Sequence, residues 1–167
     1  MKIPAFLKDY AHYLTHMRID ENAKRYEGTH KQRTGVVQSK LLGSCDREYY
    51  TEYIGILSEL IIRLRVEKNR NCVAYKASSM IKHSHLATND ADIVVYRAED
   101  ERHLSIKGCE GSMKANKQAM DTENVDLVAF VVYQDPENCK IKYYSPEEVR
   151  SWDVGSGFSD FYYKELC

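Results

Sequence analysis

Two short β-like segments carry the side chains in this sequence that could do chemistry together. The run 91–96 (ADIVVY) places an acid, Asp92, near the start of one segment, and the run 103–108 (HLSIKG) places Ser105 and Lys107 in the next. Because side chains alternate along a strand, Ser105 and Lys107 should point to the same face. A carboxylate can hold a divalent cation against a phosphate, and a nearby lysine can balance charge at the attacked phosphorus. The pattern indicates metal-assisted hydrolysis of a phosphodiester.

A third charged group, Glu59, lies in a segment with the apolar spacing of a helix, from about Arg47 to Val66. Glu59 stands close to the edge of the apolar stripe of this predicted helix. A purely structural interpretation of the three residues stays open. In it, Asp92 caps a strand, Lys107 is a surface charge and Glu59 lies on a helix face, since short motifs also occur by chance.

The elements that must position these residues follow from hydrophobic periodicity. Residues 18–46 have no clear pattern and could form a loop, an arm that contacts nucleic acid, or a poorly patterned helix. The tail 155–167 has no assignment either. The run 127–133 is continuously apolar, which is typical of a strand covered on both faces. The predicted order is a helix over Phe6–Met17, a helix over 47–66, strands over 72–77, 92–96 and 103–107, a strand break at 108–111, a helix over 112–120, strands over 127–133 and 140–144, and a helix that begins at Ser145-Pro146.

An acid followed by apolar residues, a hairpin and a motif that ends in lysine resembles the signature of the PD-(D/E)xK nuclease superfamily. The resemblance covers about 47–144. It implies a restriction-endonuclease-like αβββαβ core, an α/β fold with a mixed central sheet flanked by helices. It also implies roles: Asp92 and Glu59 as metal ligands, Ile106 as a backbone-carbonyl ligand, and Lys107 as the group that orients water or stabilises charge.

The chain departs from the superfamily pattern at two positions. Ala91 replaces the proline, which is not a ligand, and Ser105 replaces the usual acidic residue. Some restriction enzymes resemble this S-x-K form and draw the missing carboxylate from a nearby helix. The candidates for that carboxylate are Glu59, Glu110, Asp121 and Glu123. We favour Glu59, with Glu52 assisting, and expect Ser105 to hydrogen-bond within the site.

Charge is unevenly distributed along the chain, although the formal net charge is −1. Residues 1–40 hold eight Lys/Arg against four Asp/Glu, and residues 121–167 hold four against ten. This asymmetry is compatible with a basic face that meets a polyanion. The side chains we expect to contact nucleic acid, with a solvated polar surface as the alternative, are Lys76, Lys82, His83, Lys114, Lys117 and Gln118.

Together these features predict one nuclease domain, with an N-terminal helix and basic arm (1–46), a catalytic core (47–144) and a C-terminal extension (145–167). We expect a Mg²⁺-dependent endonuclease, with Mn²⁺ as a substitute, that acts on DNA as a homodimer or higher oligomer. No segment is apolar for long enough to cross a membrane, and five scattered cysteines fit a reducing, cytoplasmic setting. The alternatives are an RNA endonuclease on the same fold and a catalytically silent module that binds nucleic acid or a protein.

Overall fold

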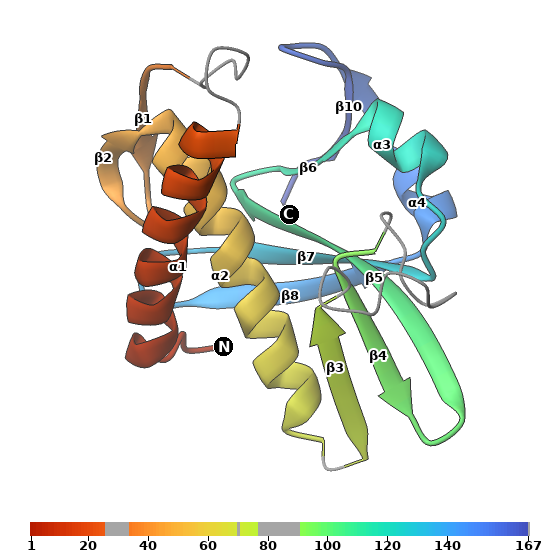
Figure 1. Cartoon of the computed structure of the whole chain (residues 1–167). Helices are drawn as coiled ribbons and strands as arrows, with labels where there is room; N and C mark the ends of the chain where they lie inside the picture. Colours follow the sequence, from red (N-terminus) through yellow and green to blue (C-terminus); the bar gives the residue numbers. More distant parts are fainter. Residues whose placement is uncertain (26–33, 70, 77–90, 167) are drawn as a thin grey trace.

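The computed structural model of the chain describes residues 1–25, 34–69, 71–76 and 91–166, and it combines helices with a central sheet (Figure 1). The elements are α1 (Ala5–Arg25), β1 (Val36–Ser39), β2 (Gly43–Asp46), α2 (Arg47–Glu67), β3 (Cys72–Lys76), β4 (Ile93–Arg97), β5 (Asp100–Glu110), β6 (Met113–Asn116), α3 (Lys117–Thr122), β7 (Leu127–Tyr133), β8 (Cys139–Tyr144), α4 (Pro146–Arg150), β9 (Asp153–Gly155) and β10 (Phe161–Lys164).

The central sheet has five strands in the order β3-β4-β5-β7-β8. Strand β4 pairs antiparallel with both β3 and β5, β5 and β7 are parallel, and β8 returns antiparallel to β7. The connection from β5 to β7 contains β6 and α3, because parallel neighbours need a crossover. The expected mixed α/β fold, with a mixed central sheet flanked by helices, is therefore confirmed.

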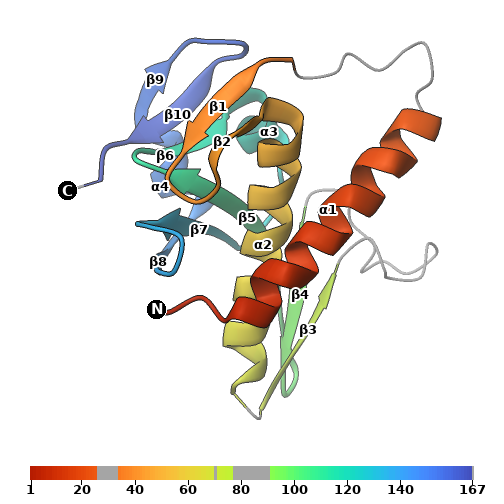
Figure 2. The same ribbon diagram turned by 90° about the vertical axis from the view of Figure 1, so that its left-hand side faces the viewer.

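Helices and strands cover the two faces of this sheet differently (Figures 1 and 2). Helix α2 packs on one face, and α1 lies against α2. On the other face lie α3, α4 and a three-stranded sheet of order β6-β10-β9. The six carboxyl-terminal residues of β7 are buried, as the apolar run 127–133 predicts.

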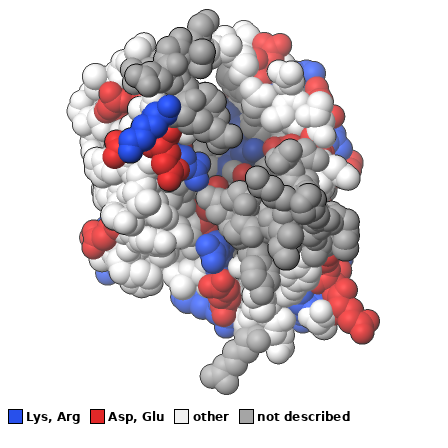
Figure 3. Space-filling view, viewed as in Figure 1, with Lys and Arg blue, Asp and Glu red and all other residues white. Residues whose placement is uncertain are grey.

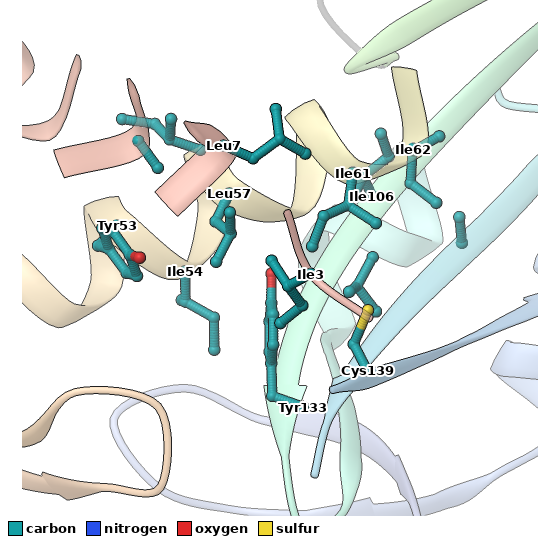
Figure 4. Close-up of a cluster of buried hydrophobic side chains, with 14 of the residues drawn as sticks. Ile3, Leu7, Tyr53, Ile54, Leu57, Ile61, Ile62, Ile106, Tyr133 and Cys139 are labelled. Atoms are coloured by element: carbon teal, nitrogen blue, oxygen red, sulfur yellow. The ribbon is translucent and has the colours of Figure 1, made fainter. Parts of the chain in front are cut away.

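Each face of the sheet has its own hydrophobic core. The first core joins α1, α2 and the sheet through Leu7, Leu57, Ile61 and Ile106 (Figure 4). The second core contains Met120 of α3, Val149 of α4 and Phe130 of β7. Strand β7 serves both cores, since Ala129 and Val131 belong to the first core and its alternate residues to the second. Side chains from β5 can therefore reach either of two different environments.

Capping residues fix the first residues of α2 and α4 at the positions that the sequence predicts. Asp46 precedes α2 and accepts hydrogen bonds from the backbone N–H groups of Glu48 (2.8 Å) and Tyr49. Ser145 and Glu148 form the expected capping box at the start of α4, where Ser145 N–H donates to Glu148 Oε2 at 3.0 Å. The predicted starts of both helices are confirmed.

Several predicted boundaries are wrong. Strand β5 does not break at Gly108, which pairs with Val131 of β7, and the turn falls at Gly111 instead, where φ is 74°. Residues Met113–Asn116 form a strand rather than helix, so the helix predicted over 112–120 begins only at Lys117. The β6 residues pair with β10, which lies in the unassigned tail.

The amino-terminal region is also more ordered than its pattern indicates. Helix α1 continues to Arg25, and residues 36–46 form a hairpin of β1 and β2. Leu41, in the turn of this hairpin, is 7% exposed and belongs to the first core. No helix in the described ranges is both long enough and apolar enough to cross a membrane.

Candidate active site

Asp92 stands where β4 and β5 separate. The register between the two strands ends at Ile93 and Leu104, whereas β5 continues to Glu110. Beyond this point a side chain replaces the backbone as the acceptor for β5, because Asp92 Oδ2 accepts a hydrogen bond from the Ile106 N–H at 2.6 Å. The contact fits strand capping and also fixes a carboxylate beside the middle of β5. A carboxylate oxygen can accept further bonds, so this contact leaves capacity for a ligand.

Ser105 and Lys107 lie on the same face of β5, as predicted, and this face is turned away from α2. Their partners in register on β7 are Val128 and Phe130, which belong to the second core. Ser105 is fully buried, and its Oγ has no hydrogen-bond partner within the described part of the chain. Lys107 is less buried, with 23% of its side chain exposed. The two polar groups therefore stand in a largely apolar setting.

Glu123 reaches Lys107 from the end of α3. Its Oε1 lies 3.4 Å from Lys107 Nζ, and its side chain is 13% exposed. Its other oxygen, Oε2, is buried and has no hydrogen-bond partner among the residues that the structure describes. A buried polar atom without a partner costs roughly 1–3 kcal/mol, so such atoms are uncommon in folded proteins. Ser105 Oγ, on the same face of β5 as Lys107, and Glu123 Oε2 are two such atoms.

Three other acidic residues considered from sequence have structural partners. Glu110 accepts hydrogen bonds from Ser39 Oγ at 2.7 Å and from the Lys40 and Leu41 N–H groups, and so holds the β1–β2 turn. Asp121 accepts hydrogen bonds from Lys117 and Tyr162, and these bonds lower its pKa. Glu52 pairs with Arg18 at 3.7 Å. Each of these carboxylates has a role in joining elements.

Glu59 lies in a different region from Lys107. It lines a groove between α1 and α2, together with Leu14, Arg18 and Arg63. Helix α2 covers the face of the sheet opposite the one that carries Lys107. The structure therefore brings Asp92, Ser105, Lys107 and Glu123 to one part of β5, and Glu59 to the helical layer.

The residues expected to contact nucleic acid fall into two groups. Lys114 and Lys117 rest on aromatic rings of β10, with Nζ 4.9 Å from the Phe161 centroid and 5.6 Å from that of Tyr162. Gln118 is exposed on α3 and lines a shallow groove of about 390 Å³ with Lys117 and Asp121. The other three predicted contacts, the side chain of Lys76 and residues Lys82 and His83, lie outside the described residues.

The electrostatics of the described surface are mixed. Acidic and basic side chains stand next to each other over the centre of the face in Figure 3, rather than forming one basic patch. On the Lys107 face of β5, burial raises the pKa of Cys109 to about 12, so this thiol stays protonated at neutral pH. A protonated thiol is a poor nucleophile and a poor metal ligand, so the chemistry considered for this face rests on its acidic oxygens and on Lys107.

Among the described residues, two carboxylates, Asp92 and Glu123, lie beside this part of β5 rather than three. No group of three His, Cys, Asp or Glu side chains able to hold a metal occurs in the described ranges. Comparison with known proteins finds no matching family model, curated protein or solved structure. Glu123 is one of the four carboxylates that the sequence offers as candidates, of which the resemblance favours Glu59. The feature that distinguishes Glu123 from Glu59 is the face of the sheet that each helix covers. Helix α3, which follows Lys107 in the chain, packs on the same face as Lys107, whereas α2 packs on the opposite face.

Proposed function

We propose that this protein is a metal-dependent endonuclease that hydrolyses DNA phosphodiester bonds. Two contacts on neighbouring residues of β5, where β4 and β5 diverge, carry the proposal: Asp92 accepts a hydrogen bond from the Ile106 N–H, and Glu123 pairs with Lys107. Ser105 Oγ and Glu123 Oε2 are buried on this side of the sheet and have no hydrogen-bond partner among the described residues. The order α2, β3, β4, β5, α3, β7 supports the finer assignment of a restriction-endonuclease-like core, with β6 as an addition.

The chemistry of the donors fits a small, hard cation. Asp92, Glu123 and the carbonyl oxygen of Ile106 would hold Mg²⁺, and all three are oxygen ligands of the kind this ion prefers. When bound, the ion supplies charge neutralisation at the phosphate and a bound water that ionises more readily. The residue set is small, and Mg²⁺ commonly keeps several waters and takes further oxygens from substrate phosphate.

The remaining side chains have separate tasks in this proposal. Lys107, held by Glu123, presents an ammonium group that stabilises negative charge on the attacked phosphate. Ser105 supplies a neutral hydroxyl at the position where the superfamily pattern has a carboxylate, and Glu123 supplies the missing negative charge from α3. The role of Glu59 as a ligand remains a prediction, which its own substitution tests.

The experiment is cleavage of supercoiled plasmid, duplex oligonucleotide and single-stranded RNA with Mg²⁺ or Mn²⁺. The variants are Asp92→Asn, Lys107→Met, Glu123→Gln and Glu59→Gln, with Glu137→Gln, at an exposed turn, as the matched control. We expect the first three variants to lose about 100-fold or more of the activity, the scale typical of lost acid–base or charge-stabilising groups, and the control to lose none.

Other outcomes would change the proposal in defined ways. If Glu59→Gln removes activity and Glu123→Gln does not, the metal site lies toward α2. Cleavage of RNA alone keeps the site and replaces the substrate, since the catalytic groups do not select the sugar. If the folded, metal-loaded protein cuts nothing, it is a silent binding module. Binding of Mn²⁺, measured by calorimetry with and without Asp92→Asn, separates a failed substrate choice from an absent metal site.

A further inference from the structure

Helix α1 has two apolar faces, and only one of them is buried by packing within the described part of the chain. Leu7 and Ala11 are buried against α2 and the first core. A second line of large side chains points to solvent along the same helix. Its members and their exposed fractions are Phe6 (63%), Tyr10 (50%), Tyr13 (60%) and Met17 (42%). We call this line the α1 stripe.

The spacing of the α1 stripe is that of a helix–helix seam. Its residues follow one another at intervals of four, three and four, which keeps them on one side of a helix and matches the heptad positions that pack against a partner helix. Tyr10 and Tyr13 already stack on each other, with ring centroids 6.5 Å apart. Figure 3 shows a largely uncharged surface over the amino-terminal half of α1. Contiguous apolar surface of this kind typically marks an interaction site.

A groove lies beside the carboxyl-terminal half of the α1 stripe. Tyr10, Leu14 and Met17 of α1 line it with Ile56 and Leu60 of α2, and its volume is about 280 Å³. Charged residues stand at its walls, among them Arg18 and Arg63. The protruding ring of Phe6 is at the other end of the stripe and does not line this groove. One half of the surface is thus a projection and the other half is a hollow.

We propose that the α1 stripe is a homodimer interface in which two copies of α1 pack antiparallel about a two-fold axis. This arrangement sets Phe6 of each copy against Met17 of the other, and Tyr10 against Tyr13. Each Phe6 ring then enters the groove of the other copy, which gives two equivalent contacts related by the two-fold axis. A two-fold interface requires this kind of self-complementary surface.

The area of the α1 stripe agrees with a second copy as the occupant. Aromatic side chains offer about 150–250 Å² each, so at these exposures the stripe buries roughly 400 Å² per protomer. With the groove walls added, the total approaches the ~1,000 Å² of a specific interface.

The inference does not depend on the proposed nuclease activity, because the stripe lies on α1 and the Asp92–Lys107–Glu123 region lies across the sheet from α2. The test is the molar mass of the full chain by light scattering and sedimentation over about 1–100 µM, the range in which a micromolar dimer assembles. We expect a dimer, with the dissociation constant raised at least about tenfold by Phe6→Ser or Tyr13→Glu. Phe158→Ser is the matched control, since Phe158 is fully exposed elsewhere and should leave the constant unchanged.

Cross-linking tests the orientation of the two helices. In the antiparallel arrangement, mixing the Phe6→Cys and Met17→Cys proteins gives an oxidised dimer that neither variant gives alone. The unsubstituted chain shows the background from its own cysteines. A monomer at every concentration overturns the proposal, and so does a dimer that Phe6→Ser and Tyr13→Glu leave intact. A dimer that Phe6→Cys alone cross-links would be parallel and would overturn the antiparallel geometry.

Discussion

Ser105 carries a buried hydroxyl in an apolar setting. Such a group affects the stability of the fold and the binding of a ligand in opposite directions. Ser105 Oγ is fully buried, with no hydrogen-bond partner among the described residues. An unsatisfied buried polar atom lowers the free energy of unfolding, whereas one that meets a ligand contributes to binding. Within the described part of the chain, the hydroxyl therefore contributes no hydrogen bond to the stability of the unliganded fold.

The substitution Ser105→Ala tests this reasoning. Because the hydroxyl has no hydrogen bond to lose among the residues that the structure describes, we expect the free energy of unfolding to stay level or rise by up to about 1–2 kcal/mol. Urea unfolding in the absence of metal measures it. Cleavage activity should fall in the same variant. A loss of more than about 1 kcal/mol would instead indicate that the Oγ makes a stabilising hydrogen bond.

At the scale of elements, the contact between α2 and β5 depends on a residue without a side chain. A Cβ at Gly108 would stand 2.4 Å from Ser58 Oγ and 2.8 Å from the backbone oxygen of Ile54. Ser58 Oγ is fixed in turn, since it bonds Ile54 O at 2.6 Å and Tyr133 Oη at 2.9 Å. The helix backbone therefore approaches β5 as closely as glycine allows.

We accordingly expect Gly108→Ala to lower the free energy of unfolding by about 1–3 kcal/mol, because α2 must move off the sheet. The matched control is Gly55→Ala in the same helix, where the added Cβ meets nothing within 4 Å. That change should stabilise the protein by about 0.5–1 kcal/mol through better helix propensity. Equal effects of the two substitutions in thermal and urea unfolding would contradict this account of the contact.

The elements that sequence predicts well are those whose signals are local. Helix α2 has a continuous apolar stripe and an Asp46 cap, and β7 is a strand because seven consecutive apolar residues cannot be solvated. Strand β6 has no such signal. Its four residues become a strand because β10, about fifty positions later, pairs with them. The sequence predicts a strand break at Gly108 for a similar reason. The glycine is needed for the close approach to Ser58 of α2, which is a tertiary contact and has no local sequence signal.

The candidate site likewise has one part that local sequence signals predict and one part that depends on tertiary packing. The alternation of Ser105 and Lys107 on one face of β5, with Asp92 beside that strand, follows from strand periodicity and the hairpin. The choice between Glu59 and Glu123 does not follow, because it depends on which face each helix covers. The superfamily resemblance favours Glu59 of α2, whereas the carboxylate that contacts Lys107 in the structure is Glu123, directly after α3.

At the scale of the whole molecule, two cores share one sheet, and their common strand should make them unfold together. Strand β7 contributes Ala129 and Val131 to the first core and Phe130 to the second. The second core has its own reporter, because Trp152 is the single tryptophan and its ring lies 5.2 Å from that of Phe130. Leu57 belongs to the first core, on the far side of the sheet.

Removing Leu57 should therefore be detected at Trp152. Leu57 is fully buried, so Leu57→Ala should cost about 2–5 kcal/mol. If the domain unfolds in one step, Trp152 fluorescence and far-ultraviolet circular dichroism will show the same lowered urea midpoint. Val36→Ala, at an exposed position, should move neither signal. A Trp152 midpoint that keeps its original value while the dichroism shifts would mean that the layer of α3, α4 and β10 unfolds independently, and Glu123 would then be held by a separate unit from Asp92.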